Sequence, residues 1–356
     1  MPLGLIESSD GGYSVASSGL YATIPGSRLT QGFLDATRPA RTVIWVYRDG
    51  AIIDGFIVWQ RTRRIGSRHL ELRCANLLSY LNRRTLNATK NYTAVDQHDI
   101  ARDLVTYMQA QSGGNIGVVN TTTNDSGIAR DRLPLAEGYE RKSIGQLLSQ
   151  LASVEQGFEY SIDAAIVADA PQATFRFYYP KRGRTYAQTN LLLIRSGDNS
   201  GNLLDYDLDE DAVELATTVH GIGAGEGVDM LLTTQSDTSL LDQGWPLLED
   251  RITLKDVSVA ATLQSHARAE VTRHGLTSIE TWRLRVDPGD VSVPFGSWTV
   301  GDEARVVIED DERFPAGTNG EPGFDKVLRI IGHTVTVPDQ GGPDVVMLDV
   351  EVPILV

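Results

Sequence analysis

The sequence of 356 residues contains a single cysteine, Cys74. One cysteine excludes an intramolecular disulfide and any zinc or iron–sulfur site that needs several thiolates. The chain also lacks a run of about 18–20 apolar residues, which a membrane-spanning helix would need. Its first residues carry neither the basic nor the apolar region of a secretory signal peptide. We therefore expect a soluble protein that is made in a cytoplasm.

Basic charge is also scarce, since 32 Lys and Arg residues face 47 Asp and Glu residues and the formal net charge is −15. Proteins that read nucleic-acid sequences present a net basic face, so this acidity argues against that class. At roughly 150 residues per domain, the length predicts two or three domains. A hydrophobic share of 41% and a charged share of 22% are typical of folded globular chains.

The charge is unevenly distributed along the chain. Residues 61–90 contain eight basic residues and one acid, a net charge of +7, so the rest of the chain carries −22. Residues 197–256 contain fourteen acids and two bases. Three interpretations stay open: solvated faces, nucleic-acid binding by the basic window, or pairing of the two regions between subunits. Nucleic-acid binding is disfavoured because no aromatic residues are interleaved with the arginines. Pairing makes these possible interface residues: Arg61, Arg63, Arg64, Arg83 and Arg84.

Strand patterns occupy both ends of the chain. Residues 42–47 and 51–59 are rich in β-branched and aromatic residues, and an Asp-Gly step at 49–50 predicts a hairpin turn between them. Alternating or β-branched segments predict further strands at 69–73, 158–162, 173–179, 191–195, 212–221, 278–286, 304–308, 327–337 and 345–352. Glycine and proline between 313 and 324 predict a long exposed loop.

Helices are predicted mainly in the middle of the chain. Asp96 precedes a helix that Gly113 and Gly114 end, and Ser143 with Gln146 fits a capping box before a second helix that Gly157 ends. A short helix or helical turn is predicted at 77–86, and another helix at 258–274. Residues 90–195 therefore read as a small α+β unit.

A weak internal echo links the two ends. The segment around Gly55 is followed after 15 to 19 residues by the alternating Leu70, Leu72 and Cys74. The segment around Gly332 is followed after 14 to 18 residues by Val346, Leu348 and Val350. An apolar strand precedes each copy. A duplication would give two similar antiparallel β-domains, one near each end of the chain.

Patterns that could carry chemistry are incomplete. The glycine-rich segment 221–227 lacks a glycine required by the dinucleotide fingerprint and lacks a following helix, which favours a turn after a strand. Asp205, Asp207 and Asp209 begin like a calcium loop, but its sixth and twelfth positions hold Glu210 and Ala216. Alternating aspartates on an exposed strand or loop edge, or adventitious cation binding, are the remaining interpretations.

Nucleophile and metal signals are equally sparse. No G-x-S-x-G elbow is present, and Cys74 at the end of a strand favours a buried thiol over a nucleophile. No H-E-x-x-H pair occurs among the six scattered histidines, which are His69, His98, His220, His266, His274 and His333. The residues therefore predict neither an enzyme nor a cofactor or metal site.

Soft patterns spread along the chain resemble those of tail-hub (baseplate hub) proteins of long-tailed bacteriophages, especially minor tail proteins of phages of actinobacteria. The first two are the strand–helix junction 70–86 with its "LL…RR" end and the amphipathic helix 96–112. The next two are the capped helix that enters Gly-Phe-Glu-Tyr at 157–160 and the acidic run that enters Thr-Val-His-Gly-Ile-Gly at 218–223. The last is segment 256–306, with a helix, a Trp-Arg-Leu strand and Val-Gly-Asp-Glu-Ala-Arg-Val.

This resemblance implies a β-rich α+β fold with two tube-like antiparallel β-barrel or sandwich domains and an inserted α+β domain. The implied boundaries are 1–85 plus 196–225 for the first tube-like domain, 86–195 for the insertion, and 226–356 for the second tube-like domain with one helix. Three chains would form a ring of six similar units that joins a six-fold tail tube to a three-fold tip around the DNA channel.

The resemblance also implies a structural role without catalytic residues or cofactors. The expected partners are two further copies of the chain, the distal tail protein, the tape-measure protein and tail fibre or tip proteins. The expected location is the virion tail tip, assembled in the host cytoplasm. Two alternatives stay open: a glycan-binding host-attachment module, for which exposed aromatic clusters would be needed, and a cell-wall hydrolase.

Overall fold

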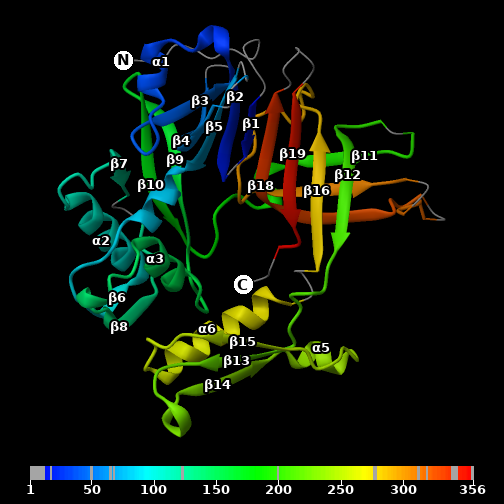
Figure 1. Cartoon of the computed structure of the whole chain (residues 1–356). Coiled ribbons are helices and arrows are strands. Elements are labelled where there is room, and N and C mark those ends of the chain that lie inside the picture. The colour runs from blue at the N-terminus through cyan, green and yellow to red at the C-terminus, as the bar shows by residue number, and fades with distance from the viewer. Residues whose placement is uncertain are drawn as a thin grey trace.

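The computed structural model describes residues 13–16, 18–48, 51–63, 66, 69–121, 124–198, 200–275, 279–310, 313–317, 320–337 and 344–353. Within these ranges one eleven-stranded sheet and three smaller sheets form a β-rich α+β fold. Figure 1 shows the large sheet as two strongly curled halves that lie side by side, with helical units to one side and below. The fold class expected from the sequence is therefore confirmed.

The first half of the large sheet comes from the N-terminal part of the chain. It contains β1 (Tyr13–Ala16), β2 (Gly19–Pro25), β3 (Val43–Arg48), β4 (Ala51–Thr62) and β5 (His69–Asn76), in the spatial order β1-β2-β5-β4-β3. All neighbouring pairs are antiparallel. The short helices η2 (Gly26–Arg28) and α1 (Gln31–Ala36) connect β2 to β3. Alternate residues of the strands form one core: Leu20, Ile24, Phe56, Val58, Leu70 and Leu72.

The predicted hairpin is present, since Arg48 of β3 pairs with Ala51 of β4. Its Asp-Gly turn at 49–50 lies outside the described residues. Cys74, on β5, packs against the core of this half-sheet. Burial raises the pKa of its thiol to about 12, which agrees with a buried and unreactive cysteine.

The second half of the sheet comes mainly from the C-terminal part. It contains β11 (Leu192–Arg195), β12 (Leu203–Glu210), β16 (Glu280–Val286), β17 (Glu303–Ile308), β18 (Phe324–Val337) and β19 (Val345–Glu351). The order is β12-β16-β19-β18-β17, with β11 parallel to β17 at the end. Its core is built by alternate residues that include Trp282, Leu284, Val306, Leu328 and Leu348.

The predicted strand 212–221 is wrong in its first part. Strand β12 ends at Glu210 and β13 begins at Thr218. Between them the Asp211 carboxylate accepts a hydrogen bond from the backbone N–H of Val213, and Leu215 N–H donates to the carbonyl of Ala212. These local bonds form turns, and Ala216 N–H donates to the distant His274 carbonyl, so the segment does not continue as a strand.

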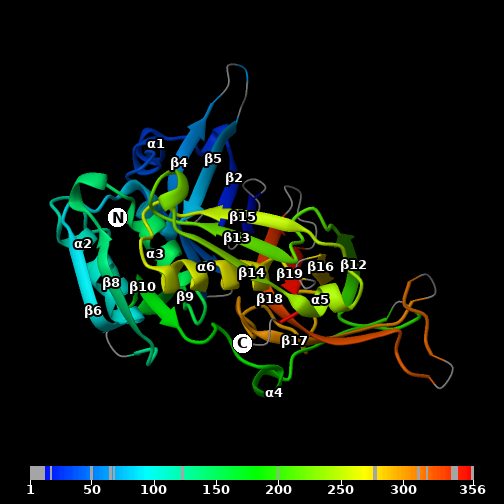
Figure 2. The ribbon, with the colours of Figure 1, turned by 90° about the horizontal axis from the view of Figure 1, so that it is seen from below.

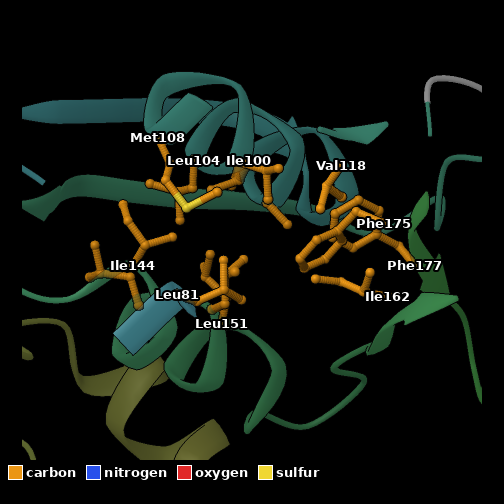
Figure 3. Packing of buried hydrophobic residues seen from close by; sticks show 14 of the residues in the cluster. Leu81, Ile100, Leu104, Met108, Val118, Ile144, Leu151, Ile162, Phe175 and Phe177 are labelled. Carbon is orange, nitrogen blue, oxygen red and sulfur yellow. The ribbon is translucent and has the colours of Figure 1, made fainter. Parts of the chain in front are cut away.

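A first insertion follows β5. It contains η3 (Leu77–Arg83), β6 (Lys90–Asp96), α2 (Gln97–Ala110), β7 (Val118–Asn120), β8 (Ala129–Ala136), η4 (Gly138–Glu140), α3 (Ile144–Ala152), β9 (Glu159–Val167), β10 (Ala170–Tyr178) and α4 (Tyr186–Thr189). Its core lies between α2, α3 and β10, where Leu104, Ile144 and Phe175 point toward one another (Figure 3).

Both predicted helix starts in this insertion are confirmed. The Asp96 carboxylate accepts from His98 N–H at 2.8 Å, and the Ser143 hydroxyl accepts from Gln146 N–H at 3.0 Å. Such caps satisfy backbone donors that have no partner within the first turn. The short helical turn predicted after β5 is η3.

A second insertion separates β12 from β16. It contains β13 (Thr218–Ile222), η5 (Gly227–Asp229), β14 (Leu232–Ser236), α5 (Thr238–Asp242), β15 (Glu249–Thr253) and α6 (Ala260–Arg273). Figure 1 shows α6 between this small sheet and the large sheet above it, and Figure 2 shows the same helix and small sheet from below. His266 on α6 bonds the Ser153 carbonyl at the end of α3 at 2.7 Å, which joins the two insertions. The glycine-rich segment follows β13 as predicted.

Two pairings bear on how the chain is divided. Strands β11 and β12, which cover residues 192–210, pair with β17 and β16 rather than with β1–β5. The domain boundaries expected from the sequence stay a prediction. None of the helices in the described part of the chain is long and apolar enough to cross a membrane.

Candidate subunit interface

The two halves of the large sheet are built on one plan. In chain order the first five strands are β1, β2, β3, β4 and β5, and they lie in the order 1-2-5-4-3. The strands β12, β16, β17, β18 and β19 lie in the same order, with the second insertion between the first two of them. Both sets are antiparallel throughout. We call these sets the first and second β-units.

The register of the two β-units agrees residue by residue around one bulge. In β4 the bulge residue is Trp59, between the pairs Val58↔Cys74 and Gln60↔Arg73. In β18 it is Ile331, between the pairs Ile330↔Val350 and Gly332↔Asp349. A bulge adds one residue to one strand and bends the sheet, so it fixes the register of everything around it.

Backbone bonds on the other edge of the bulged strand repeat as well. In the first β-unit Ala40 N–H donates to the Val58 carbonyl, and Val58 N–H donates to the Thr42 carbonyl. In the second β-unit Gly301 N–H donates to the Ile330 carbonyl, and Ile330 N–H donates to the Asp302 carbonyl. Ala40 and Gly301 both have positive φ, at 60° and 103°. The internal echo seen in the sequence therefore corresponds to a repeat of topology and register.

The β-units meet edge to edge within the chain. Strand β1 pairs antiparallel with the C-terminal part of β18, from Tyr13↔Val337 to Ala16↔Thr334. Next to this joint Arg48 forms an ion pair with Asp344 at 2.8 Å and lies over the Phe295 ring at 4.9 Å. The joint makes one continuous sheet from the two units.

Each β-unit has a second edge that is equivalent to one of the two joined edges. These two further edges lie at opposite ends of the sheet. Strand β12 is the equivalent of β1, and among the described strands it pairs with β16 alone. The end of β4 is the equivalent of the end of β18, and β3 covers this edge of β4 only as far as Ile57. Figure 1 shows β12 on the opposite flank of the molecule from β3 and β4.

These two ends differ in charge. On β12 the side chains of Asp205, Asp207 and Asp209 are exposed, while Tyr206 and Leu208 pack against the core of the second β-unit. The sequence that leaves β4 holds the densest part of the basic window, with arginines at 61, 63, 64 and 68. Alternating aspartates on an exposed strand were predicted, and the strand is β12.

The arginines proposed from the sequence as interface residues divide into three kinds. Arg61 donates to the Leu34 carbonyl and to the Thr37 hydroxyl, so it is engaged within the first β-unit. Arg84 is half-buried, donates to the Met108 carbonyl at 3.4 Å and lies over the Tyr80 ring. Arg63 and Arg83 are exposed. Arg64 lies outside the described residues.

A cavity of about 930 Å³ lies where both β-units meet the first insertion. Its wall includes Asp54, Asp163, Arg182, Trp298 and His333. Asp163 is engaged by Ser161, Tyr178 and Arg182 at 2.7 to 3.0 Å. Burial raises the pKa of Asp54 to about 6 and lowers the pKa of His333 below its usual value.

Five aromatic residues line the cavity. Phe56 and Trp298 are buried, and Tyr160, Tyr178 and Phe295 are half-buried. Across the described residues no group of three or more His, Cys, Asp or Glu side chains is placed to hold a metal ion.

A buried carboxylate fixes the first insertion on the second β-unit. Asp302 is 1% exposed and accepts hydrogen bonds from Arg184 N–H at 2.8 Å, Arg184 Nη2 at 2.6 Å and Thr299 N–H at 3.0 Å. Close by, the backbones at Gly183 and Gly301 approach so tightly that a Cβ on Gly183 would lie 2.0 Å from the Gly301 backbone. Both glycines have positive φ, so only glycine suits this contact.

Comparison with solved structures finds the same fold in tail proteins. A tail protein from Neisseria meningitidis MC58 matches with a TM-score of 0.59 and 17% identity over 96% of this chain and 92% of that chain. The 43 kDa tail protein of prophage MuSo2 from Shewanella oneidensis matches with a TM-score of 0.58 and 11% identity over 96% and 93%. The prophage tail protein gp18 from Listeria monocytogenes EGD-e matches with 0.52 and 12% over 98% and 90%.

No protein-family model and no curated protein sequence matches the chain. The three solved structures show that the chain has the fold of tail proteins, two of them from prophages, which agrees with the resemblance found in its sequence. The sequence did not show that, among the described strands, β12 pairs on one side only and the end of β4 extends past β3. Only the period-two aspartates and the basic window signalled these edges, and neither pattern says which strand is terminal in a sheet.

Proposed function

We propose that this protein is a structural hub of a bacteriophage tail tip. Three chains would form a ring of six β-units that joins a six-fold tail tube to a three-fold tip and surrounds the DNA channel. The observation that carries the proposal is the pair of β-units with one strand order and one register, because two equivalent units per chain let three chains approximate six-fold symmetry.

The fold shared with three tail proteins over nearly the whole chain supports a structural rather than a catalytic role. In this proposal the tube-like units are β1–β5 and β12 with β16–β19, which differs from the division expected from the sequence because β12 joins the second unit. Residues 77–191 and 211–279 are insertions that lie outside the ring. The insertions would offer surfaces to the distal tail protein, the tape-measure protein and tail fibre or tip proteins. The protein would be part of the virion after assembly in the host cytoplasm.

The net charge of −15 supports a DNA conduit in electrostatic terms. A basic channel would bind phosphates by counterion release and retain the genome, whereas an acidic surface repels it and leaves it free to slide.

Light scattering after size-exclusion chromatography, with negative-stain images of the same fraction, tests the proposal. We expect a particle with the mass of three chains and a three-fold ring with a central hole. The test should be made at low and high ionic strength, because contacts between exposed charges weaken in salt. A strictly monomeric protein that also fails to bind tail-tube and distal-tail proteins would contradict the hub role.

A further inference from the structure

The repeated register identifies which residues would meet across a subunit boundary. Within the chain β1 lies against the end of β18, with Val15 opposite Val335 and Ala16 opposite Thr334. On β2 and β16 the equivalent residues are Leu20 and Trp282. Leu20 pairs with Cys74 and Trp282 with Val350, and these two partners lie opposite the last residue before the bulge on β4 and β18.

The outer strands β1 and β12 correspond in the same way. Val15 pairs with Leu20 as Leu208 pairs with Trp282, so β1 residues 15 and 16 correspond to β12 residues 208 and 209. On β18, the strand against which β1 lies, Thr334 is three residues past Ile331 and pairs with Met347. Thr62 lies three residues past Trp59 and pairs with Glu71, so it is the counterpart of Thr334.

We propose that β12 of one chain adds antiparallel to the end of β4 of a second copy of this chain, with Asp209 opposite Thr62 and Leu208 opposite Arg63. This inference rests on the proposed hub role and names the contact that would close the ring. The contact is head-to-tail, since one chain supplies β12 and the other supplies β4. It repeats between chains the joint that β1 and β18 make within one chain.

Charge and hydrogen bonding both favour a second copy as the occupant. An unpaired strand edge exposes backbone N–H and C=O groups that another strand can satisfy. In this register Arg63 lies on the Leu208 face of the joined sheet, where Glu210 is the exposed carboxylate of β12, while exposed Asp207 and Asp209 lie on the other face. Opposite charges across an interface favour the correct partner and penalise contact between two β12 edges or two β4 ends.

Disulfide trapping tests the register in the full chain. The double variant T62C/D209C places both thiols on directly opposed residues, within the Cβ separation that a disulfide needs. Because the two positions lie at opposite ends of the sheet, a bond must join different chains. Mild oxidation should give a ladder on non-reducing gels that ends at three chains.

Control variants test whether the link joins different chains and whether it depends on the proposed register. A mixture of the single variants T62C and D209C should give only linked dimers, because each chain then contributes one thiol. T62C/D207C moves one thiol two residues along the same strand face, to a diagonal position too distant for a disulfide, and should link at least about tenfold less. Native Cys74 should not link, since burial raises the pKa of its thiol to about 12.

The outcomes distinguish failure of the strand pairing from failure of the hub role. A particle of three chains whose T62C/D209C variant does not link overturns the strand pairing and leaves the hub role standing. Preferential linking of T62C/D207C overturns the register. A monomer that never links overturns both, and would mean that the aspartates of β12 keep a free edge from pairing.

Discussion

Removing the buried carboxylate of Asp302 should weaken the attachment of the first insertion to the second β-unit. Asp302→Ala deletes the acceptor of the bonds from Arg184 and Thr299. Breaking a buried ion pair costs about 3–5 kcal/mol. Here the Arg184 side chain is 48% exposed and can return to water, so we expect a loss at or just below the lower limit of this range, about 2–3 kcal/mol.

A surface ion pair of the same chemistry is the control. Arg305 and Asp325 approach to 2.5 Å, but their side chains are 43% and 33% exposed. Exposed pairs contribute about 0–1 kcal/mol, so Asp325→Ala should lower stability by no more than that. Asp302→Asn retains an oxygen acceptor without the charge and should fall between the two.

Urea unfolding followed by circular dichroism measures the difference. The midpoint should fall furthest for Asp302→Ala, and the slope with urea should be unchanged if the denatured states are similar. Equal losses for Asp302→Ala and Asp325→Ala would refute the reasoning, because burial of the acceptor would then have no energetic consequence.

Three further predictions follow from local contacts. Burial raises the pKa of Asp54 to about 6, above the value near 3.9 of an unfolded chain. The native state therefore binds this proton more tightly, and stability falls as pH rises from about 4 to 6. Asp54→Asn should therefore gain about 1–2 kcal/mol over the parent at pH 7 and nothing at pH 4, in paired urea titrations; an equal gain at both pH values would contradict this. Ser143→Ala should lose about 1 kcal/mol through the missing cap on α3, and no shift in the urea midpoint would show that the cap is replaced by water at no cost. Gly55→Ala should lower stability by about 1–3 kcal/mol, because its Cβ would lie 2.4 Å from the Trp45 ring. The control Gly32→Ala, whose Cβ would have one neighbouring atom at 3.9 Å, should be neutral or slightly stabilising in thermal melts. Equal effects at the two glycines would rule out the clash.

The sequence by itself determined the local structure of this protein. Three kinds of local feature could be predicted, because each depends on residues close together in the chain. They are the helix caps at Asp96 and Ser143, the hairpin before Ala51, and the alternating strands of both β-units. The echo around Gly55 and Gly332 could be seen for the same reason, since each copy is a short segment with its own pattern.

Only the tertiary structure decided which strands are neighbours and which edges stay open. Strand β12 pairs with β16 across the whole second insertion, and no local pattern encodes a partner at that distance. For the same reason the arginines of the basic window look alike in the sequence. In the structure Arg61 donates to the Leu34 carbonyl and Arg84 to the Met108 carbonyl, whereas Arg63 is exposed. Backbone hydrogen bonds between strands do not depend on side-chain identity. The joint of β1 with β18, and the edges of β12 and β4 that no described strand covers, therefore arise only when the sheet forms.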